Sequence, residues 1–338
     1  MAAPTSAMPE PGRSAAAPVA GVPDPLHESL RIGALALDRR LFMAPMAGIT
    51  SLAFRRSVRR WGAGLAFTEM ISAYGVHYRN RRTLDYLTCG QDEHPLGFQL
   101  FGADADVLAD AAARCVEAGA DVVDLNMACP ARKVVRTGAG AALLGDPDRA
   151  AAIVAEVVDA VEGRVPVTVK IRSGLREGDE AGRRTAPRLV AAGAAAVCIH
   201  PRMASQLYRG RADHAVTFAL AAELPVPVIA TGDVDGRAAA LALLEGGAAA
   251  VMLARHALGR PWLFAEILDD AQPPSREARL AEVRHFTGDV RRDMGARSVG
   301  YLRQFWPRYR RAGVLDKDLA HALMLAADTD AVRELLGM

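Results

Sequence analysis

Cys129 is the residue of this sequence whose chemical type and position most directly suggest catalysis. It follows residues 121–127, an apolar segment of strand length, and precedes Pro130. Proline lacks a backbone N–H and cannot continue a strand ladder, so the thiol is expected just past the C-terminal end of a strand. Enzymes built on parallel sheets place reactive groups at that end.

The neighbours of Cys129 favour one of two interpretations. A free cysteine is most often a small, buried and unreactive hydrophobic residue. Here Asn126 lies before the thiol, and three cations, Arg132, Lys133 and Arg136, follow it. Such neighbours make a poor core, so the sequence favours a reactive thiol beside a basic loop, with the inert cysteine as the alternative.

The elements that would position these residues form a repeating pattern. Short apolar runs alternate with stretches of helical character, which indicates βαβ units and a parallel sheet. The runs span residues 41–45, 64–70, 95–101, 121–127, 166–171, 195–200, 226–230 and 248–253. They predict an α/β fold, a (β/α)8 TIM barrel of about 250 residues that forms a catalytic domain over residues 26–270. A doubly wound sheet is the alternative, but no G-x-G-x-x-G follows the first run.

The segments outside the barrel differ in composition. Residues 1–25 are rich in Ala, Pro and Ser and lack an apolar centre, which predicts a disordered tail and not a signal peptide. Residues 30–38 predict a small cap before the first barrel strand. After a linker at 272–275, residues 276–338 show no strand-like alternation and predict a small all-helical domain.

Arginines in this helical domain are interleaved with aromatic residues. The aromatic residues are Tyr301, Phe305, Trp306 and Tyr309, among Arg291, Arg292, Arg297, Arg303, Arg308, Arg310 and Arg311. Such a combination can bind RNA through phosphate contacts and base stacking. The alternative, compatible with the first, is a bundle with an aromatic core and solvated arginines.

The overall composition excludes several functions. The net charge of +2 over 338 residues confines any nucleic-acid surface to a local patch. The four cysteines lack C-x-x-C spacing, which indicates a reducing compartment and no zinc site. No apolar run approaches the roughly 20 residues that span a membrane. We therefore expect a cytoplasmic, monomeric protein that uses neither a metal nor a membrane.

Polar residues and glycines cluster where the predicted strands end. They are Pro45, Met46 and Ala47 after the first strand, Gln99 in the third, Asn126 and Cys129 after the fourth, Lys170 in the fifth, His200 and Arg202 at the sixth, Thr231, Gly232 and Asp233 at the seventh, and Ala254 and Arg255 at the eighth. Loops after the last two strands of a barrel often bind phosphate. A phosphate there, with Lys170 and His200 in the middle of the site, suits FMN, because a cation near the ring stabilises the reduced flavin. Either residue alone could instead belong to a structural ion pair.

These motifs, in this order, resemble those of the bacterial tRNA-dihydrouridine synthases, FMN-dependent enzymes that reduce uridine in tRNA. The resemblance covers roughly residues 30–270. It rests on APMAGIT at 44–50, QLFG at 99–102, NMACPARKV at 126–134, KIRSG at 170–174, TGD at 231–233 and GRPW at 259–262. The sequence departs from the family pattern at Ala128, where glycine is usual, and at Ala204, Thr231 and Ala254.

The resemblance implies a reaction in two halves. NADPH reduces FMN, the flavin delivers a hydride to C6 of a uracil in tRNA, and Cys129 protonates C5. A thiol with an ordinary pKa of about 8.5 is mostly protonated at neutral pH and can donate. The base must leave its stack to reach the flavin. The strand-end residues from Pro45 to Arg255 would then hold FMN, and Asn126, Arg132, Lys133, Arg136 and Arg202 would bind the tRNA.

Two other functions remain open at this point. A flavin oxidoreductase of the dihydroorotate or dihydropyrimidine type, acting on a free pyrimidine, uses a similar N-x-x-C-P loop and the same barrel end. The helical domain with its arginines and aromatic residues favours the RNA substrate. A catalytically inactive RNA-binding barrel is the third possibility, and intact Cys129 and Lys170 argue against it.

Overall fold

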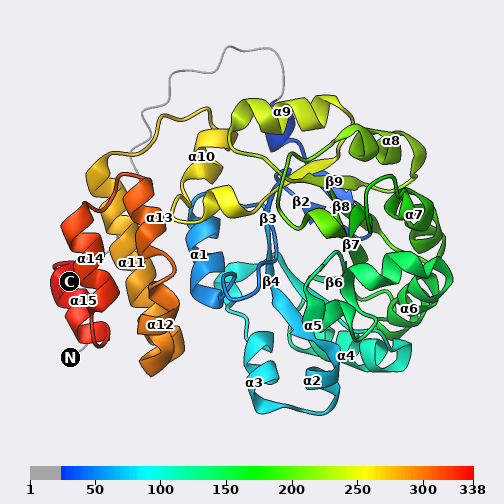
Figure 1. Ribbon diagram of the computed structural model, residues 1–338, viewed down its shortest axis with the longest axis horizontal. Helices are drawn as coiled ribbons and strands as arrows, with labels where there is room; N and C mark the ends of the chain where they lie inside the picture. The colour runs from blue at the N-terminus through cyan, green and yellow to red at the C-terminus, as the bar shows by residue number, and fades with distance from the viewer. Residues whose placement is uncertain (1–23) are drawn as a thin grey trace.

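Eight parallel strands close into a barrel in residues 24–338, the part of the chain that our computed structural model describes. Their order around the barrel is their order in the sequence, and the last strand pairs with the first (Figure 1). The strands are Leu41–Met43 (β3), Leu65–Ser72 (β4), Leu96–Phe101 (β5), Val122–Met127 (β6), Val167–Gly174 (β7), Ala196–Met203 (β8), Val228–Thr231 (β9) and Ala250–Leu253 (β10). Each lies on one of the predicted apolar runs, so the predicted TIM barrel is confirmed. The tail predicted at 1–25 lies outside the described residues, except for residues 24 and 25.

Helices lie in the segments that follow the barrel strands, and the longer ones pack on the outside of the barrel. They are Leu52–Arg60 (α1), Ala73–His77 (α2), Arg81–Leu84 (α3), Ala105–Glu117 (α4), Arg132–Val135 (α5), Pro147–Ala160 (α6), Ala181–Ala191 (α7), Ala215–Glu223 (α8), Arg237–Glu245 (α9) and Leu263–Leu268 (α10). Helix α6 shows why they form where they do. Asp146 caps its first turn by accepting from the N–H of Arg149, Pro147 occupies the first helical position, and Ile153, Val154 and Val157 are buried against the sheet.

A hairpin closes the N-terminal end of the barrel. Its strands, Leu30–Ile32 (β1) and Leu35–Leu37 (β2), pair antiparallel, and Ile32 and Leu37 are buried among residues that fill the barrel interior. Gly33, in the turn of the hairpin, lies close to Pro166, just before the start of β7, because a Cβ on Gly33 would lie 3.2 Å from the Pro166 Cβ. The cap predicted at residues 30–38 is therefore present, at the end opposite to the strand C-termini.

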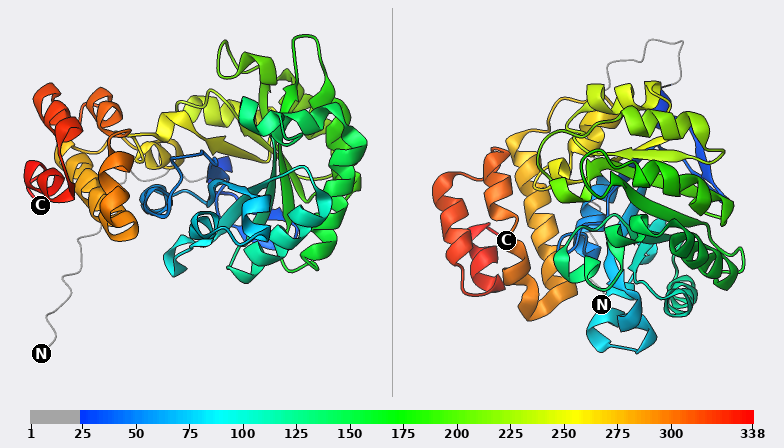
Figure 2. Two further views of the ribbon diagram at one scale, coloured as in Figure 1. Left: turned by 60° about the horizontal axis from the view of Figure 1, so that its bottom comes forward. Right: turned by 45° about the vertical axis from the view of Figure 1, so that its right-hand side comes forward.

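The chain ends in a helical domain that lies beside the barrel (Figure 2). Its helices are Arg276–Met294 (α11), Ser298–Leu302 (α12), Trp306–Arg311 (α13), Lys317–Leu325 (α14) and Thr329–Leu335 (α15). Phe305 and Trp306 are fully buried, Tyr309 is 2% exposed, and the rings of Phe286 and Phe305 are 4.9 Å apart. These aromatic side chains form the core of the domain, so their rings are not available to stack on RNA bases.

The helical domain and the barrel share one core. Phe54 of α1 lies 5.7 Å from the ring of Phe305 and 6.3 Å from that of Phe286. Around this contact, Arg60 of α1 forms ion pairs with Glu282 at 2.7 Å and Asp289 at 3.0 Å. The apolar contact and the buried carboxylates fix the position of the helical domain relative to the barrel strands.

Candidate active site

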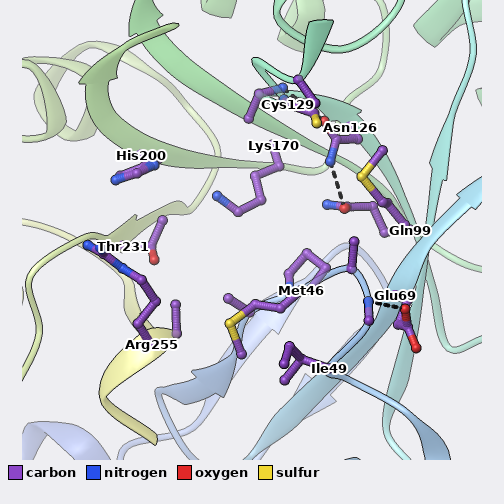
Figure 3. Close-up of a pocket in the computed structure, with 18 of the residues that line it drawn as sticks. Met46, Ile49, Glu69, Gln99, Asn126, Cys129, Lys170, His200, Thr231 and Arg255 are labelled. Carbon is purple, nitrogen blue, oxygen red and sulfur yellow. Dashed lines mark hydrogen bonds between the residues drawn. The ribbon is translucent and has the colours of Figure 1, made fainter. Parts of the chain in front are cut away.

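A pocket of about 750 Å³ opens at the C-terminal ends of the barrel strands (Figure 3). It brings together all but three of the predicted site residues. The predicted residues that line it are Pro45, Met46, Ala47, Gln99, Asn126, Cys129, Lys133, Lys170, His200, Thr231, Gly232, Asp233, Ala254 and Arg255. Their convergence follows from the parallel order of the strands, which places every strand C-terminus on one face of the barrel.

A chain of hydrogen bonds runs across three strands beneath Cys129. Asp124, buried on β6, accepts from Gln99 Nε2 at 2.7 Å and from Thr168 Oγ1 at 2.6 Å. The side-chain oxygen of Gln99, Oε1, accepts from Asn126 Nδ2 at 2.8 Å (Figure 3). Because each side chain is held by the next, the amide groups of Gln99 and Asn126 have fixed orientations in the pocket wall.

The backbone at Cys129 is fixed from two sides. Asn126 Oδ1 accepts from the N–H of Cys129 at 2.8 Å and from that of Ala128 at 3.1 Å. The Cys129 carbonyl accepts from the N–H of Ala141 at 3.0 Å. Gly140 permits that contact, because it has φ +62° and a Cβ there would lie 2.6 Å from the Cys129 oxygen. The thiol is thus half-buried at the edge of the pocket on a rigid turn.

Arg172 also supports this turn, a role that the sequence did not reveal. It is 2% exposed on β7, and its Nε donates to the Ala128 carbonyl at 2.8 Å. Its Nη1 donates to the carbonyls of Met203 and Leu207, at 3.0 and 2.8 Å. Arg172 therefore joins the loops after β6 and β8. Its partners are backbone atoms, which carry no sequence pattern.

Lys170 and Asp124 place opposite charges in the pocket wall and just behind it. Lys170 of β7 is 9% exposed, and its side chain points into the pocket (Figure 3). Burial raises the pKa of Asp124 to about 6, against the opposing effects of its two hydrogen bonds and of the Lys170 charge. Lys170 therefore places a basic side chain at the centre of the site.

His200 stays neutral in this environment. Burial, together with the charges of Lys170, Arg172, Arg202 and Arg255, lowers its pKa to about 2. Its Nε2 accepts from Arg202 Nη1 at 3.2 Å, which leaves the proton on Nδ1. The residue therefore offers a neutral ring and not a second cation.

The turn after β9 has the features of an anion site. Gly232 and Asp233 both have positive φ, +118° and +56°. A Cβ on Gly232 would lie 3.0 Å from His200 Cδ2, so the turn packs directly on the pocket. Within residues 24–338, the N–H groups of Gly232, Asp233 and Arg255 donate to no protein acceptor. Such free N–H groups, beside the Arg255 side chain, suit a phosphate.

The remaining three predicted residues lie outside the pocket lining. Arg202 is 2% exposed and donates to both oxygens of Asp233, at 2.8 and 2.7 Å, and to the Gly210 carbonyl at 2.7 Å. Its guanidinium is thus committed to holding the anion turn and not turned toward a substrate. Arg132 and Arg136 are exposed on or next to α5, outside the pocket rim at which Lys133 lies.

Glu69 is a pocket residue that sequence reasoning missed. It lies on β4, is 8% exposed, and its carboxylate accepts from the N–H of Gly48 (Figure 3). Burial raises its pKa, which the hydrogen bond from Gly48 partly offsets. A carboxylate inside the apolar run 64–70 was the available signal, because such a group is costly to bury without a function.

Tyr208 and Arg308 also line the pocket without having been predicted. The Tyr208 ring stacks on His200 at 6.2 Å, and the guanidinium carbons of Arg172 and Arg255 lie 5.6 and 5.0 Å from its centroid. Arg308 comes from the helical domain. It packs against Gly259 of the barrel, and a Cβ on Gly259 would lie 2.6 Å from the Arg308 Cβ. The sequence around these two residues does not predict their place in the pocket, because the loop conformation brings Tyr208 there and the packing of the helical domain brings Arg308.

The described residues set limits on other kinds of site. Residues 24–338 contain no group of three or more His, Cys, Asp or Glu side chains arranged to hold a metal ion. In the same range, no helix combines the length and the apolar character needed to cross a membrane.

A closed barrel with a lysine in its central pocket, an anion turn beside its last strands and a thiol at the pocket edge suits the binding of a phosphate-bearing cofactor. The sequence profile of the dihydrouridine synthases matches residues 42–299. The chain belongs to this family of flavin-dependent oxidoreductases.

Individual relatives agree with the family profile. The chain is 41% identical over 242 residues to tRNA-dihydrouridine synthase B of Pseudomonas aeruginosa, a match that covers 70% of this chain and 71% of the relative. It is 42% identical over 241 residues to probable tRNA-dihydrouridine synthase 1 of Synechocystis sp., covering 70% and 67%.

Solved structures show the same fold at low identity. The 6-hydroxypseudooxynicotine amine oxidase of Pseudomonas geniculata N1 superposes with a TM-score of 0.59 at 16% identity, over 72% of this chain. Histamine dehydrogenase of Rhizobium sp. 4-9 superposes with a TM-score of 0.57 at 15% identity, over 79% of this chain. Our chain spans half the length of each, and the likeness concerns the fold alone.

Proposed function

We propose that this protein is a tRNA-dihydrouridine synthase that reduces the C5–C6 double bond of a uridine in tRNA, with FMN as bound cofactor and NADPH as reductant. The observation that carries the proposal is the placement of Cys129 at the edge of the pocket, where Asn126 holds its N–H and the N–H of Ala141 holds its carbonyl. The printed names of the relatives support tRNA as the substrate.

The residues of the pocket fit FMN. Its phosphate would lie against the free N–H groups of Gly232, Asp233 and Arg255, and its ring system would lie near Lys170 and Gln99. The remaining strand-end residues, from Pro45 to Ala254, would complete the cofactor site. The turn offers one phosphate position, and no adenosine-binding fingerprint follows the first strand, which favours FMN over FAD.

Three side chains of the pocket have separate roles in the proposed reaction. The flavin, when bound and reduced by NADPH, supplies the hydride for C6 of the uracil. Lys170 provides positive charge beside the cofactor, and neutral His200 adds no competing charge. The Cys129 thiol donates its proton to C5, and the hydrogen bond from its N–H to Asn126 keeps the sulfur at the pocket edge.

Cations around the pocket mouth support an RNA substrate. Arg132, Lys133 and Arg136 are exposed around α5, where they would bind phosphates of the strand that delivers the base. On the helical domain, the side chains of Arg303, Arg310 and Arg311 are exposed and form no ion pair within residues 24–338. We propose that the protein acts as a monomer, and a tRNA substrate supports a cytoplasmic location.

Single-turnover kinetics of Cys129→Ala test the proposal. The variant should fold, hold FMN and oxidise NADPH normally, because none of these steps needs the thiol. With the flavin reduced anaerobically, adding unmodified tRNA should reoxidise it about 10²–10⁴-fold more slowly than in the wild type, the usual loss for a general acid. Cys129→Ser should recover little, since a hydroxyl is a much weaker acid.

Two outcomes would contradict the proposal in different ways. Reoxidation of the Ala variant at the wild-type rate would show that Cys129 is not the acid. Wild-type reoxidation by orotate or free uracil, but not by tRNA, would assign the protein to the oxidoreductases of free pyrimidines.

A further inference from the structure

The chain makes an excursion at the pocket rim between β4 and β5. After β4 it forms α2 and α3, which project from the barrel below β4 in Figure 1. The excursion is next to the active site, because Thr83 of α3 and Tyr86, which follows it, line the pocket. Ser72 caps α2 and Asn80 caps α3, so the two short helices have defined ends.

Tyrosine rings face solvent on this excursion. Tyr78 is 72% exposed and Tyr74 is 43% exposed, and their rings stack with centroids 6.3 Å apart and planes 20° apart. The His77 ring meets Tyr78 edge-on at 4.8 Å, and its Nδ1 lies 3.0 Å from the Asp110 carboxylate. Tyr78 is therefore oriented by His77 and by its stacking on Tyr74, although the two tyrosines contribute little to the protein core. Large aromatic side chains left in water at a fixed orientation indicate a binding surface.

Three exposed arginines accompany the tyrosines. Arg79, Arg81 and Arg82 lie in the four residues that follow Tyr78. None of them has a carboxylate within ion-pair distance in residues 24–338, whereas Arg56, in the neighbouring helix α1, pairs with Asp92. Their positive charge is thus uncompensated and directed at solvent.

We propose that this excursion is a second RNA-docking surface, which binds the nucleotides that flank the target uridine. The proposal rests on the proposed function and adds to it a surface outside the helical domain. Tyr74 and Tyr78 stack on a flanking base, and the three arginines bind the adjoining phosphates. A base that is drawn into the pocket loses its stacking partners, so an aromatic platform at the rim offsets part of that cost.

Burial elsewhere in the molecule favours this assignment. The aromatic residues of the helical domain that could have stacked on bases, Phe305, Trp306 and Tyr309, are in its core. The excursion instead presents its rings to solvent beside the pocket. Arg297, at the start of α12, lies 3.7 Å from Asp85, so the excursion adjoins the arginine-rich helical domain. An RNA strand can therefore contact both surfaces while one base occupies the pocket.

The test compares two double variants of the full-length FMN-bound protein. Tyr74→Ala with Tyr78→Ala removes the rings, whereas Tyr74→Phe with Tyr78→Phe keeps them and removes only the hydroxyls. Both should keep the wild-type FMN content and rate of NADPH oxidation, because these side chains lie outside the cofactor pocket. The Ala variant should bind unmodified tRNA about tenfold more weakly or worse, and the Phe variant within about twofold of the wild type.

A third variant tests the charges independently of the rings. Arg81→Gln with Arg82→Gln should weaken tRNA binding and reduce the slope of log affinity against log salt by about 2. This measurement keeps the proposal testable should the double Ala variant fold poorly.

Each contrary result has a separate meaning. If the wild type binds tRNA and forms dihydrouridine while both the Ala and the Arg variants bind equally well, the docking surface is overturned and the proposed function stands. If the Phe and Ala variants lose affinity equally, stacking is excluded. If the wild type neither binds nor modifies tRNA, the proposed function fails, and the docking surface fails with it.

Discussion

The side-chain amide of Gln304 donates a hydrogen bond of 2.8 Å to the carbonyl oxygen of Gly48. Glu69 of the barrel accepts from the N–H of the same glycine. One residue of the pocket loop is thus held by the helical domain on one side and by the barrel on the other. Tyr301 extends this contact, because its hydroxyl donates to the Ile49 carbonyl and accepts from Ser51 Oγ at 2.8 Å. The loop after β3 therefore depends on the helical domain for its conformation.

Tyr301→Phe should loosen this loop. The substitution removes the hydroxyl that donates to the Ile49 carbonyl and accepts from the Ser51 hydroxyl, so these two groups keep only the N–H donors of Ser51 and Phe54 as partners. The loss should cost about 0.5–1.5 kcal/mol in the free energy of unfolding. The FMN dissociation constant should rise with it, as measured by fluorescence titration. Tyr309→Phe is the matched control, because that hydroxyl makes no hydrogen bond to another described residue. Equal loss of FMN affinity in both variants would show that the loop contact is not the cause.

Gly140→Ala should disturb Cys129 without changing its chemistry. A Cβ at residue 140 would lie 2.6 Å from the Cys129 carbonyl oxygen, so the turn that carries the thiol must shift. We expect normal FMN content and slower flavin reoxidation by tRNA, by about tenfold or more, as displacements near 1 Å at a reacting group produce. Gly163→Ala has comparable backbone strain at φ +69° but open space around the new Cβ, so its kinetics should match the wild type. Identical kinetics for Gly140→Ala would mean that the turn tolerates displacement.

Lys170→Met should weaken FMN binding and slow flavin reduction by NADPH. The variant keeps the length of the side chain and removes the cation at the centre of the pocket. Lys170→Arg should recover only part of the activity, because a planar guanidinium does not replace a compact ammonium. Lys317→Met, at an exposed position of α14, serves as the control. A Lys170→Met protein that binds FMN and turns over normally would reduce Lys170 to a structural partner of Asp124.

The pH dependence of stability should report on His200. The pKa of His200 is about 2 in the folded protein and near 6.5 in the unfolded chain. Its neutral form therefore contributes stability that is complete above pH 6.5 and is lost as the pH falls toward 2. In urea titrations between pH 7 and pH 4, the unfolding free energy of His200→Gln should fall less steeply than that of the wild type. Parallel curves would indicate that His200 titrates normally when folded.

The barrel strands could be predicted because parallel strands of a barrel are buried on both faces. They read as continuous apolar runs, and all eight runs became strands. Most of the residues that line the pocket could be predicted for a related reason, since polar residues at the ends of parallel strands converge on one face of the barrel. The family motifs added the expected cofactor and reaction.

Residues that act through distant partners could not be predicted. The sequence predicts Arg202 as a substrate ligand, but its partner Asp233 lies 31 residues away, and their ion pair is a product of the closed barrel. The aromatic residues of the helical domain could be assigned to its core or to RNA until α1 was seen to pack against them. The excursion of α2 and α3 is too short to show a helical period, so its exposed tyrosines gave no signal in the sequence.

The hairpin of β1 and β2 has a consequence for the order of events. It seals one end of the barrel, and side chains such as Phe42 and Phe67 fill the interior above it. The pocket therefore opens to solvent at the strand C-termini, opposite to the hairpin. On the proposed function, NADPH and the tRNA would both enter through this opening and would compete for the same space. Initial-rate plots against either substrate should accordingly give parallel lines, and an excess of one should slow the use of the other.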